Sequence, residues 1–303
     1  MPQPSARSRA LELAADFAVQ APSGYSTLPW RLDREPDRLL IRADRSRGLT
    51  ALDPGGRELV QSVGAAVFNV RVALADAGWA SEVERLPSPD DPALLAAVRA
   101  RLGVPDPALA ALAPAAGRRR TNRRRFTGAH LPDAVLRRLT EIAESEGVLL
   151  VPVVADEHRR LVERLTQQAD GLQNVDPAQR ADRPSSRPKD GGGVQPDLMP
   201  LAPETRSDVD LTMVLLATRT DDPPAWLRAG EALQHLLLEL TRLGWVASPL
   251  TQAIEVPLTR TRLRGALTWA AHPQMLLRIA QAPAAGVPRY RPASDGRGGT
   301  VGA

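Results

Sequence analysis

The sequence predicts a mixed fold of helices and short strands in which one structural unit occurs twice. Residues 64–81 and 230–248 are the two copies, and each contains a long apolar helix that ends at a glycine and turns at a tryptophan into an extended segment. The glycines that bound the helix are fourteen residues apart in both copies. Glycine suits the left-handed position that ends a helix. Two unrelated helices sharing this ending are the alternative, but duplication explains the equal spacing and predicts a pseudo-twofold axis.

The elements of the first part are predicted from apolar spacing and turn residues. Leu11, Ala14 and Phe17 follow a helical spacing, the apolar residues within 38–43 favour a hairpin, and Pro54 suits the first turn of a long helix. The expected elements are a helix over residues 5–20, strands over 29–33 and 38–43, a helix over 53–78, a strand over 81–86, and helices over 92–102 and 107–113.

The second part is predicted in the same way. A Val-rich run over residues 148–155 has no polar alternation and favours a buried strand. The other expected elements are helices over 132–147, 157–172 and 223–243 and strands over 210–218 and 274–280.

Residues 173–207 differ in composition, because they are rich in Pro, Gly, Ser and charged residues and lack apolar periodicity. Such long segments in a compact domain are usually functional covers or disordered, so we expect a lid-like insertion. We divide the chain into halves at residues 1–115 and 116–303.

Composition limits the classes of protein and of site. Hydrophobic residues make up 43% of the chain, and no apolar run approaches the roughly 18 residues of a membrane span. The N-terminus lacks the pattern of a secretory signal, so we expect a cytoplasmic protein. The absence of cysteine excludes disulfides and thiolate sites, and the four histidines have no metal-ligand spacing. Because Lys189 is the only lysine, the high isoelectric point reflects arginine use and does not predict nucleic-acid binding.

A cluster of arginines over residues 118–126 has the chemistry of a phosphate site. It holds six arginines in eight positions, and Arg119, Arg120 and Arg123 bracket Thr121. Arginine offers forked, permanently charged donors to phosphate, which the hydroxyl and backbone amide of Thr121 can complete. A solvated basic loop or a nucleic-acid patch is the alternative, but aromatic residues for base stacking are not interleaved.

Together with residues 21–30, this cluster resembles the two signature segments of the nitroreductase superfamily. The order of the segments is similar to that of the Acg-type branch, whose members bind FMN. The resemblance covers residues 14–291. It implies an α+β fold with a mixed, mostly antiparallel sheet flanked by helices, and a chain that is a fused dimer. It also implies FMN phosphate contacts at Arg119, Thr121 and Arg123, and it places Arg120 and Asn122 among the FMN-binding residues of the same segment.

The resemblance implies three further groups of FMN-binding residues. Ser23, Gly24 and Ser26 belong to the first signature segment, in which Tyr25, Ser26 and Leu28 replace the His, Asn and Gln of the family pattern. The other two groups are a loop near the flavin with Ser248, Pro249 and Leu250, and a basic pair near the C-terminus, Arg289 and Arg291.

Each of the last two groups has an alternative interpretation. Residues 248–251 are otherwise an ordinary helix-to-strand turn, and the tail that holds the basic pair is otherwise a disordered basic segment. The segment after Trp79 lacks the Ser-Pro-Leu sequence of its copy, which predicts one flavin per chain and not two.

The implied activity is reduction of a nitro, quinone or similar acceptor by NAD(P)H through FMN, without an indispensable catalytic side chain. The expected partners are NAD(P)H and a small-molecule acceptor, without nucleic acid or membrane, and a homodimer of such chains is possible. Three alternatives stay open: a flavin-sequestering protein with little turnover, a biosynthetic flavin-dependent oxidase or dehydrogenase, and a scaffold without flavin.

Overall fold

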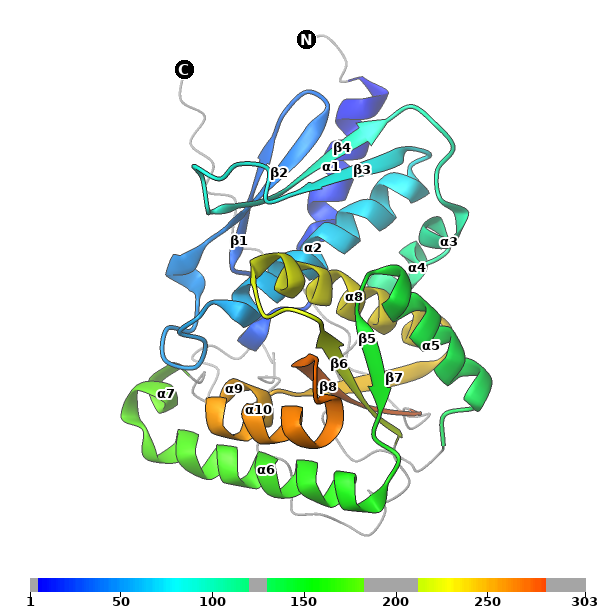
Figure 1. Ribbon diagram of the computed structural model, residues 1–303. Coiled ribbons are helices and arrows are strands. Elements are labelled where there is room, and N and C mark those ends of the chain that lie inside the picture. The colour runs from blue at the N-terminus through cyan, green and yellow to red at the C-terminus, as the bar shows by residue number, and fades with distance from the viewer. Residues whose placement is uncertain (1–4, 120–129, 183–211, 282–303) are drawn as a thin grey trace, which may run out of the picture.

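Two four-stranded sheets with surrounding helices form the part of the chain that the structure describes (Figure 1). The computed structural model describes residues 5–119, 130–182 and 212–281. Every strand pairing is antiparallel. Helices and strands therefore occur together in one α+β fold, as the resemblance implied.

The first half contains the predicted hairpin and a long central helix. Its sheet has the order β1-β2-β4-β3, and Trp30 pairs with Ala43 in the hairpin. Helices α1 and α2 pack on this sheet through a core of Leu, Val and Ala residues. The elements are α1 (Ala6–Ala18), β1 (Trp30–Arg34), β2 (Arg38–Ala43), α2 (Arg57–Asp76), β3 (Ala80–Arg85), β4 (Leu94–Arg101), α3 (Pro107–Ala110) and α4 (Ala113–Ala116).

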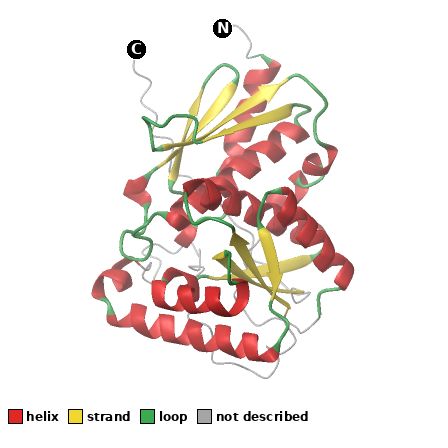
Figure 2. Ribbon diagram, in the orientation of Figure 1, coloured by secondary structure: helices red, strands yellow, loops and turns green. Residues whose placement is uncertain are grey.

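The second half repeats this strand order, as β5-β6-β8-β7. Helices α5 and α8 cover one face of its sheet, and α6, α9 and α10 cover the other (Figure 2). The elements are α5 (Asp133–Ser145), β5 (Leu149–Pro152), α6 (Asp156–Val175), α7 (Pro177–Asp182), β6 (Thr212–Thr218), α8 (Pro223–Arg242), β7 (Trp245–Leu250), α9 (Gln252–Glu255), α10 (Pro257–Leu263) and β8 (His272–Gln281).

The halves meet where α2 crosses α8. A Cβ on Gly64 would lie 2.1 Å from the Leu227 carbonyl oxygen, and one on Gly230 would lie 1.9 Å from the Gln61 carbonyl oxygen. Each glycine thus contacts the residue three positions before the other, the reciprocal pattern of two subunits about a twofold axis. Gly78 and Gly244, with φ of 82° and 81°, follow the two helices as the repeat predicts. Their backbone conformation suits glycine.

Helix α2 has the length and composition of a membrane-spanning helix, the one such helix within the described residues. However, 94% of its apolar window is buried inside the protein. The central position of α2 between the first sheet and α8 explains this composition without a membrane (Figure 1).

Two predicted elements are wrong. Residues 92–102 form no helix, because Leu94–Arg101 is β4, which pairs with β2 on one side and with β3 on the other. Its Leu and Ala residues are buried, and a short apolar run does not distinguish a buried strand from a helix. The predicted insertion begins later than residue 173, since α6 runs to Val175 and is followed by α7. Residues 183–211, and with them most of the predicted lid, lie outside the described residues.

Candidate functional site

The segment between α1 and β1, residues 19–29, is an irregular loop with an unusual backbone. Tyr25, Ser26 and Leu28 have φ of 54°, 58° and 46°, values that non-glycine residues seldom adopt. Side chains within the loop hold this shape. Ser23 Oγ accepts a hydrogen bond from the Leu28 amide at 3.0 Å, and Thr27 Oγ1 donates to the Gly24 carbonyl at 3.0 Å. Such strain concentrates at functional sites.

The loop lies on the first two turns of α2. The Gly24 amide donates to Ser62 Oγ at 3.4 Å, and Ser62 Oγ donates to the Glu58 carbonyl at 2.7 Å. A Cβ on Gly24 would lie 3.8 Å from Glu58 Oε2, so the loop backbone passes close to this carboxyl group. A cavity of about 10 Å³ separates the loop from α2, which leaves space for one water molecule at most.

At the same end of α2, polar side chains cross from one half to the other. Arg57 Nη1 donates to the Gln274 carbonyl at 2.8 Å, and Gln61 Nε2 donates to Gln274 Oε1 at 3.0 Å. Gln274 Nε2 then donates to Thr218 Oγ1 at 2.7 Å. We call Arg57, Glu58, Gln61 and Gln274 the interhalf polar cluster. All four are buried, so these hydrogen bonds fix the position of the α2 N-terminus on the second sheet.

The charge around the interhalf polar cluster comes from three carboxyl groups and the guanidinium of Arg57. The carboxyl groups belong to Asp53, Glu58 and Glu255. Burial, with the nearby charge of Glu255, raises the pKa of Glu58 well above its ordinary value, although Arg57 Nη2 donates to Glu58 Oε1 at 2.9 Å. Burial also raises the pKa of Asp53, whose Oδ2 accepts from the Leu59 amide, and lowers the pKa of Arg57. Burial therefore favours the neutral forms of Glu58 and Asp53.

Helix α9 borders the cluster from the second half. Gln252 Oε1 and Glu255 Oε1 are buried, and neither oxygen has a hydrogen-bond partner within the described residues. The two residues are three positions apart, so they share one face of the helix. Gln173 Nε2 of α6 donates to the other Glu255 oxygen at 2.5 Å. This face of α9 thus offers two unused acceptors.

Residues 248–250 do not form the predicted loop. They belong to β7, in which Ser248 pairs with Arg278 and Leu250 with Leu276 of β8. The Trp after the helix begins a paired edge strand here, just as β3 follows Trp79 in the first half. The turn follows directly at Thr251, the N-cap residue of α9.

The structure brings the start of the basic segment to the loop. Arg119 Nη2 donates to the Gln20 carbonyl at 3.4 Å, three residues before Ser23. The predicted residues Arg120, Thr121, Asn122, Arg123, Arg289 and Arg291 lie outside the described residues. Arg119, at the start of the basic segment, therefore lies beside Gln20, the residue before the first signature segment. The individual FMN contacts stay predictions.

The interhalf polar cluster is not predicted by the sequence. Glu58 is an acidic residue in the first turn of a helix, which ordinarily indicates a favourable dipole interaction at the surface. Gln61 is a polar residue in a mainly apolar helix, and Gln274 begins a predicted strand. A polar residue on the buried face of α2 was the available signal, but its partner in β8 could not be identified without the fold.

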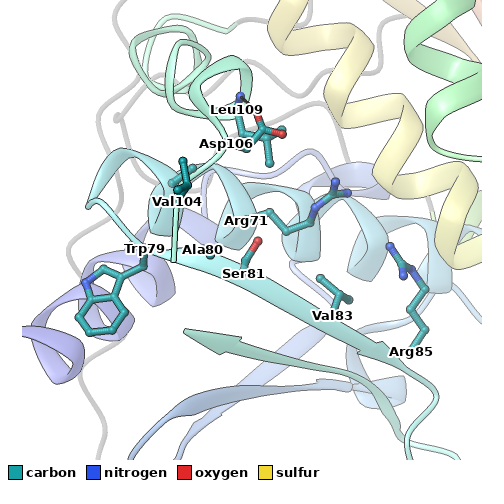
Figure 3. A pocket seen from close by; sticks show the side chains of 10 residues that line it. Arg71, Trp79, Ala80, Ser81, Val83, Arg85, Val104, Asp106 and Leu109 are labelled. Atoms are coloured by element: carbon teal, nitrogen blue, oxygen red, sulfur yellow. Dashed lines mark hydrogen bonds between the residues drawn. The ribbon is translucent and has the colours of Figure 1, made fainter. Parts of the chain in front are cut away.

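A larger cavity of about 330 Å³ lies elsewhere, between β3, α2 and α3 in the first half (Figure 3). Figure 3 shows Arg71 and Arg85 at one end of it, pointing toward α8. Both guanidinium groups bond to Glu231, and Arg71 also bonds to Glu146, so their charges are already balanced. This cavity contains none of the residues predicted from the signature segments.

Comparisons with known proteins agree with this arrangement. The chain is 34% identical over 293 residues to a protein of Mycobacterium tuberculosis (strain ATCC 25618 / H37Rv) named "Putative NAD(P)H nitroreductase Rv3131", covering 88% of this chain and 83% of the relative. The chain belongs to the nitroreductase family. A second relative from the same strain, "Putative NAD(P)H nitroreductase acg", is 27% identical over 307 residues, covering 93% of this chain and 92% of the relative.

Comparison with solved structures also finds the nitroreductase fold. A "putative nitroreductase" from Anabaena variabilis superposes with a TM-score of 0.60 at 9% identity, covering 93% of this chain and 90% of that one. This similarity concerns the fold alone. No family model matches the chain.

Proposed function

We propose that this nitroreductase family member binds FMN between its halves and uses NAD(P)H to reduce a nitro, quinone or similar acceptor. The observation that carries the proposal is that Arg119 donates to the Gln20 carbonyl at the start of the loop over residues 19–29, while Gly24 of the same loop donates to Ser62 at the end of α2 that holds the interhalf polar cluster. Family membership and the printed names of the relatives support the same activity.

The donors and acceptors of the described residues fit a flavin. Arg119 provides a forked cation for a phosphate, and Ser23, Gly24 and Ser26 provide a loop whose backbone can approach a ring closely. The buried Gln252 Oε1 and Glu255 Oε1 are acceptors that a ring N–H can satisfy. FMN, when bound, supplies the chemistry of accepting a hydride and passing two electrons on.

The chain's own residues then have binding and positioning roles. The arginines hold the phosphate, since a charge-assisted, forked contact combines affinity with orientation. The strained loop and the hydrogen bonds of the interhalf polar cluster keep the wall of the site rigid, which preorganises it. No described side chain is assigned a proton transfer in this proposal.

The partners of the protein, its FMN stoichiometry and its cellular location follow from the same function. We infer NAD(P)H and a small-molecule acceptor as the partners, one FMN per chain, and a cytoplasmic protein that forms homodimers of duplicated chains. The division of the halves near residue 115 belongs to the same proposal. The strand order shared by the two halves and the interhalf polar cluster support it.

The visible absorption spectrum of the purified full-length protein tests the proposal. We expect a flavin spectrum, bleached by NADPH without oxygen and restored by a nitroaromatic or quinone. A flavin that dithionite bleaches and NADPH or NADH does not would favour the flavin-sequestering alternative. A colourless protein that also fails to quench the fluorescence of added FMN would contradict FMN binding. Riboflavin should bind more weakly because it lacks the phosphate.

A further inference from the structure

Glu58 is a buried carboxyl group at the point where the loop over residues 19–29 lies on α2. It stands in the first turn of α2 and is 8% exposed. It lines the small cavity beneath the loop together with Gly24, Thr27 and Ser62. This space is too small for the water that would solvate a charged carboxylate.

The charged groups that face Glu58 do not balance a negative charge. Arg57 on the same helix is its one close cation among the described residues, and Arg57 also donates to the Gln274 carbonyl. Two further carboxyl groups face it, Asp53 from the preceding turn and Glu255 from α9. Three carboxyl groups therefore share one guanidinium in a buried space, an arrangement in which one group stays protonated.

The protonation state of Glu58 affects the loop over residues 19–29. A neutral carboxyl group can remain buried under Gly24 with no solvent, whereas an ionised one calls for water or another cation. Because Gly24 passes close to the Glu58 carboxyl group and bonds to Ser62, admitting water between them requires the loop to move away from α2. Burial and Glu255 act in the same direction when they raise the pKa of Glu58.

We propose that Glu58 is a positioning residue that supports residues 19–29 as an uncharged carboxylic acid at neutral pH, and that its ionisation in alkaline solution displaces the loop and weakens FMN binding. This inference rests on the proposed function, because it takes the loop as one wall of the FMN site. It concerns regulation of the site by a proton and gives Glu58 no contact with the reacting atoms.

FMN affinity measured against pH tests the inference. Fluorescence quenching is followed from about pH 6 to about pH 9.5 for the wild type, Glu58→Gln and Glu255→Gln. Wild-type affinity should fall with rising pH, by up to about tenfold per pH unit once Glu58 ionises, the limit for one proton. Glu58→Gln, which copies the neutral acid, should bind FMN and lose this decline. Glu255→Gln removes a repelling charge, so its decline should begin at lower pH.

Retention of the wild-type decline in Glu58→Gln would overturn the inference, and so would loss of FMN binding by this variant at every pH while its fold is intact. Ionisation of FMN itself affects all three proteins equally and cancels in the comparison. Failure of all three to bind FMN at any pH would instead contradict the proposed function.

Urea unfolding at different pH values tests the protonation of Glu58 in the absence of flavin. An acid whose pKa is raised in the folded protein keeps its proton while the unfolded chain loses it, so folded stability falls as pH rises above the ordinary glutamate value of about 4.3. Glu58→Gln lacks this loss, so its stability relative to the wild type should increase with pH. A stability difference that stays constant with pH would overturn the inference.

Discussion

The two halves share one strand order and differ where the first helix meets the first strand. Helices α1 and α5 each have 13 residues, yet a long strained loop follows α1, whereas only residues 146–148 separate α5 from β5. The loop in the first half covers the polar end of α2. The short connection in the second half instead places Glu146 against Arg71.

The central helices α2 and α8 also differ, in the polarity of their first turns. Helix α2 begins with Arg57 and Gln61, which donate to Gln274 in the second half, and with Glu58, which accepts from Arg57. At the positions that the repeat equates with these, α8 has two prolines and Leu227, and Leu227 is packed in the core of the first half. The α2–α8 pair thus has a polar cluster at the start of α2 and an apolar contact at the corresponding positions of α8.

A buried ionic network joins the halves away from the polar site. Glu231 is fully buried and accepts from both Arg71 and Arg85, while Glu146 accepts from Arg71 and contacts His235. Removing one partner of a buried ion pair leaves an uncompensated charge. The network therefore fixes the relative position of the halves, and its loss should have the largest effect on stability.

Glu231→Gln should lower the free energy of unfolding by about 3–5 kcal/mol, the usual cost of breaking a buried ion pair. Urea unfolding followed by tryptophan fluorescence measures it. Glu82→Gln is the matched control, because Glu82 pairs with Arg101 across an exposed contact and its loss should change little. Equal stability of the two variants would show that the network does not hold the halves.

Acid should weaken the same network. Burial alone would raise the pKa of Glu146, but hydrogen bonds from His235 and Arg71 and the charge of Arg71 lower it to about 2. The unfolded chain has the ordinary value, so this stabilisation is complete above about pH 4.3 and is lost as the pH falls toward the folded pKa, by up to about 3 kcal/mol. Acid unfolding of wild type and Glu146→Gln measures it, and an equally steep loss in the variant would contradict this assignment.

The crossing of α2 and α8 should tolerate no side chain. Gly230→Ala places a Cβ 1.9 Å from a backbone oxygen of Gln61, so the helices must separate. We expect a loss of about 1–3 kcal/mol of stability or more, as for other overpacked sites. Gly171→Ala in α6 meets nothing within 4 Å and should be neutral or stabilising. Similar urea midpoints for the two variants would contradict a close crossing.

The basic segment should affect cofactor affinity and not stability. Arg119→Ala should weaken FMN binding by about tenfold or more, the typical effect of losing one charge-assisted contact. Arg118→Ala is the control, since this neighbouring arginine is exposed and donates only to the Pro114 carbonyl. Arg123→Ala should behave like Arg119→Ala. Equal FMN affinity in all of these proteins would move the phosphate site elsewhere.

Much of the fold was predictable, because the repeat, the hairpin and the long helices all have periodic apolar patterns or glycine endings. Strand β4 could not be predicted, because a run of Leu and Ala favours a helix when it is considered alone. It forms a strand here because it pairs with β2 on one side and with β3 on the other. Of the site, the loop and Arg119 were predicted from local motifs. The Arg57 and Gln61 contacts with Gln274 were not, because they span more than 200 residues of sequence.

The number of FMN molecules bound per chain tests the account most directly. Equilibrium dialysis of the flavin-free full-length chain against FMN measures it, with protein concentration taken from amino-acid analysis. One FMN per chain is predicted, because a single strained loop and a single interhalf polar cluster occur among the described residues. Two per chain would show that both ends of the α2–α8 pair bind cofactor, and none would contradict the FMN site itself.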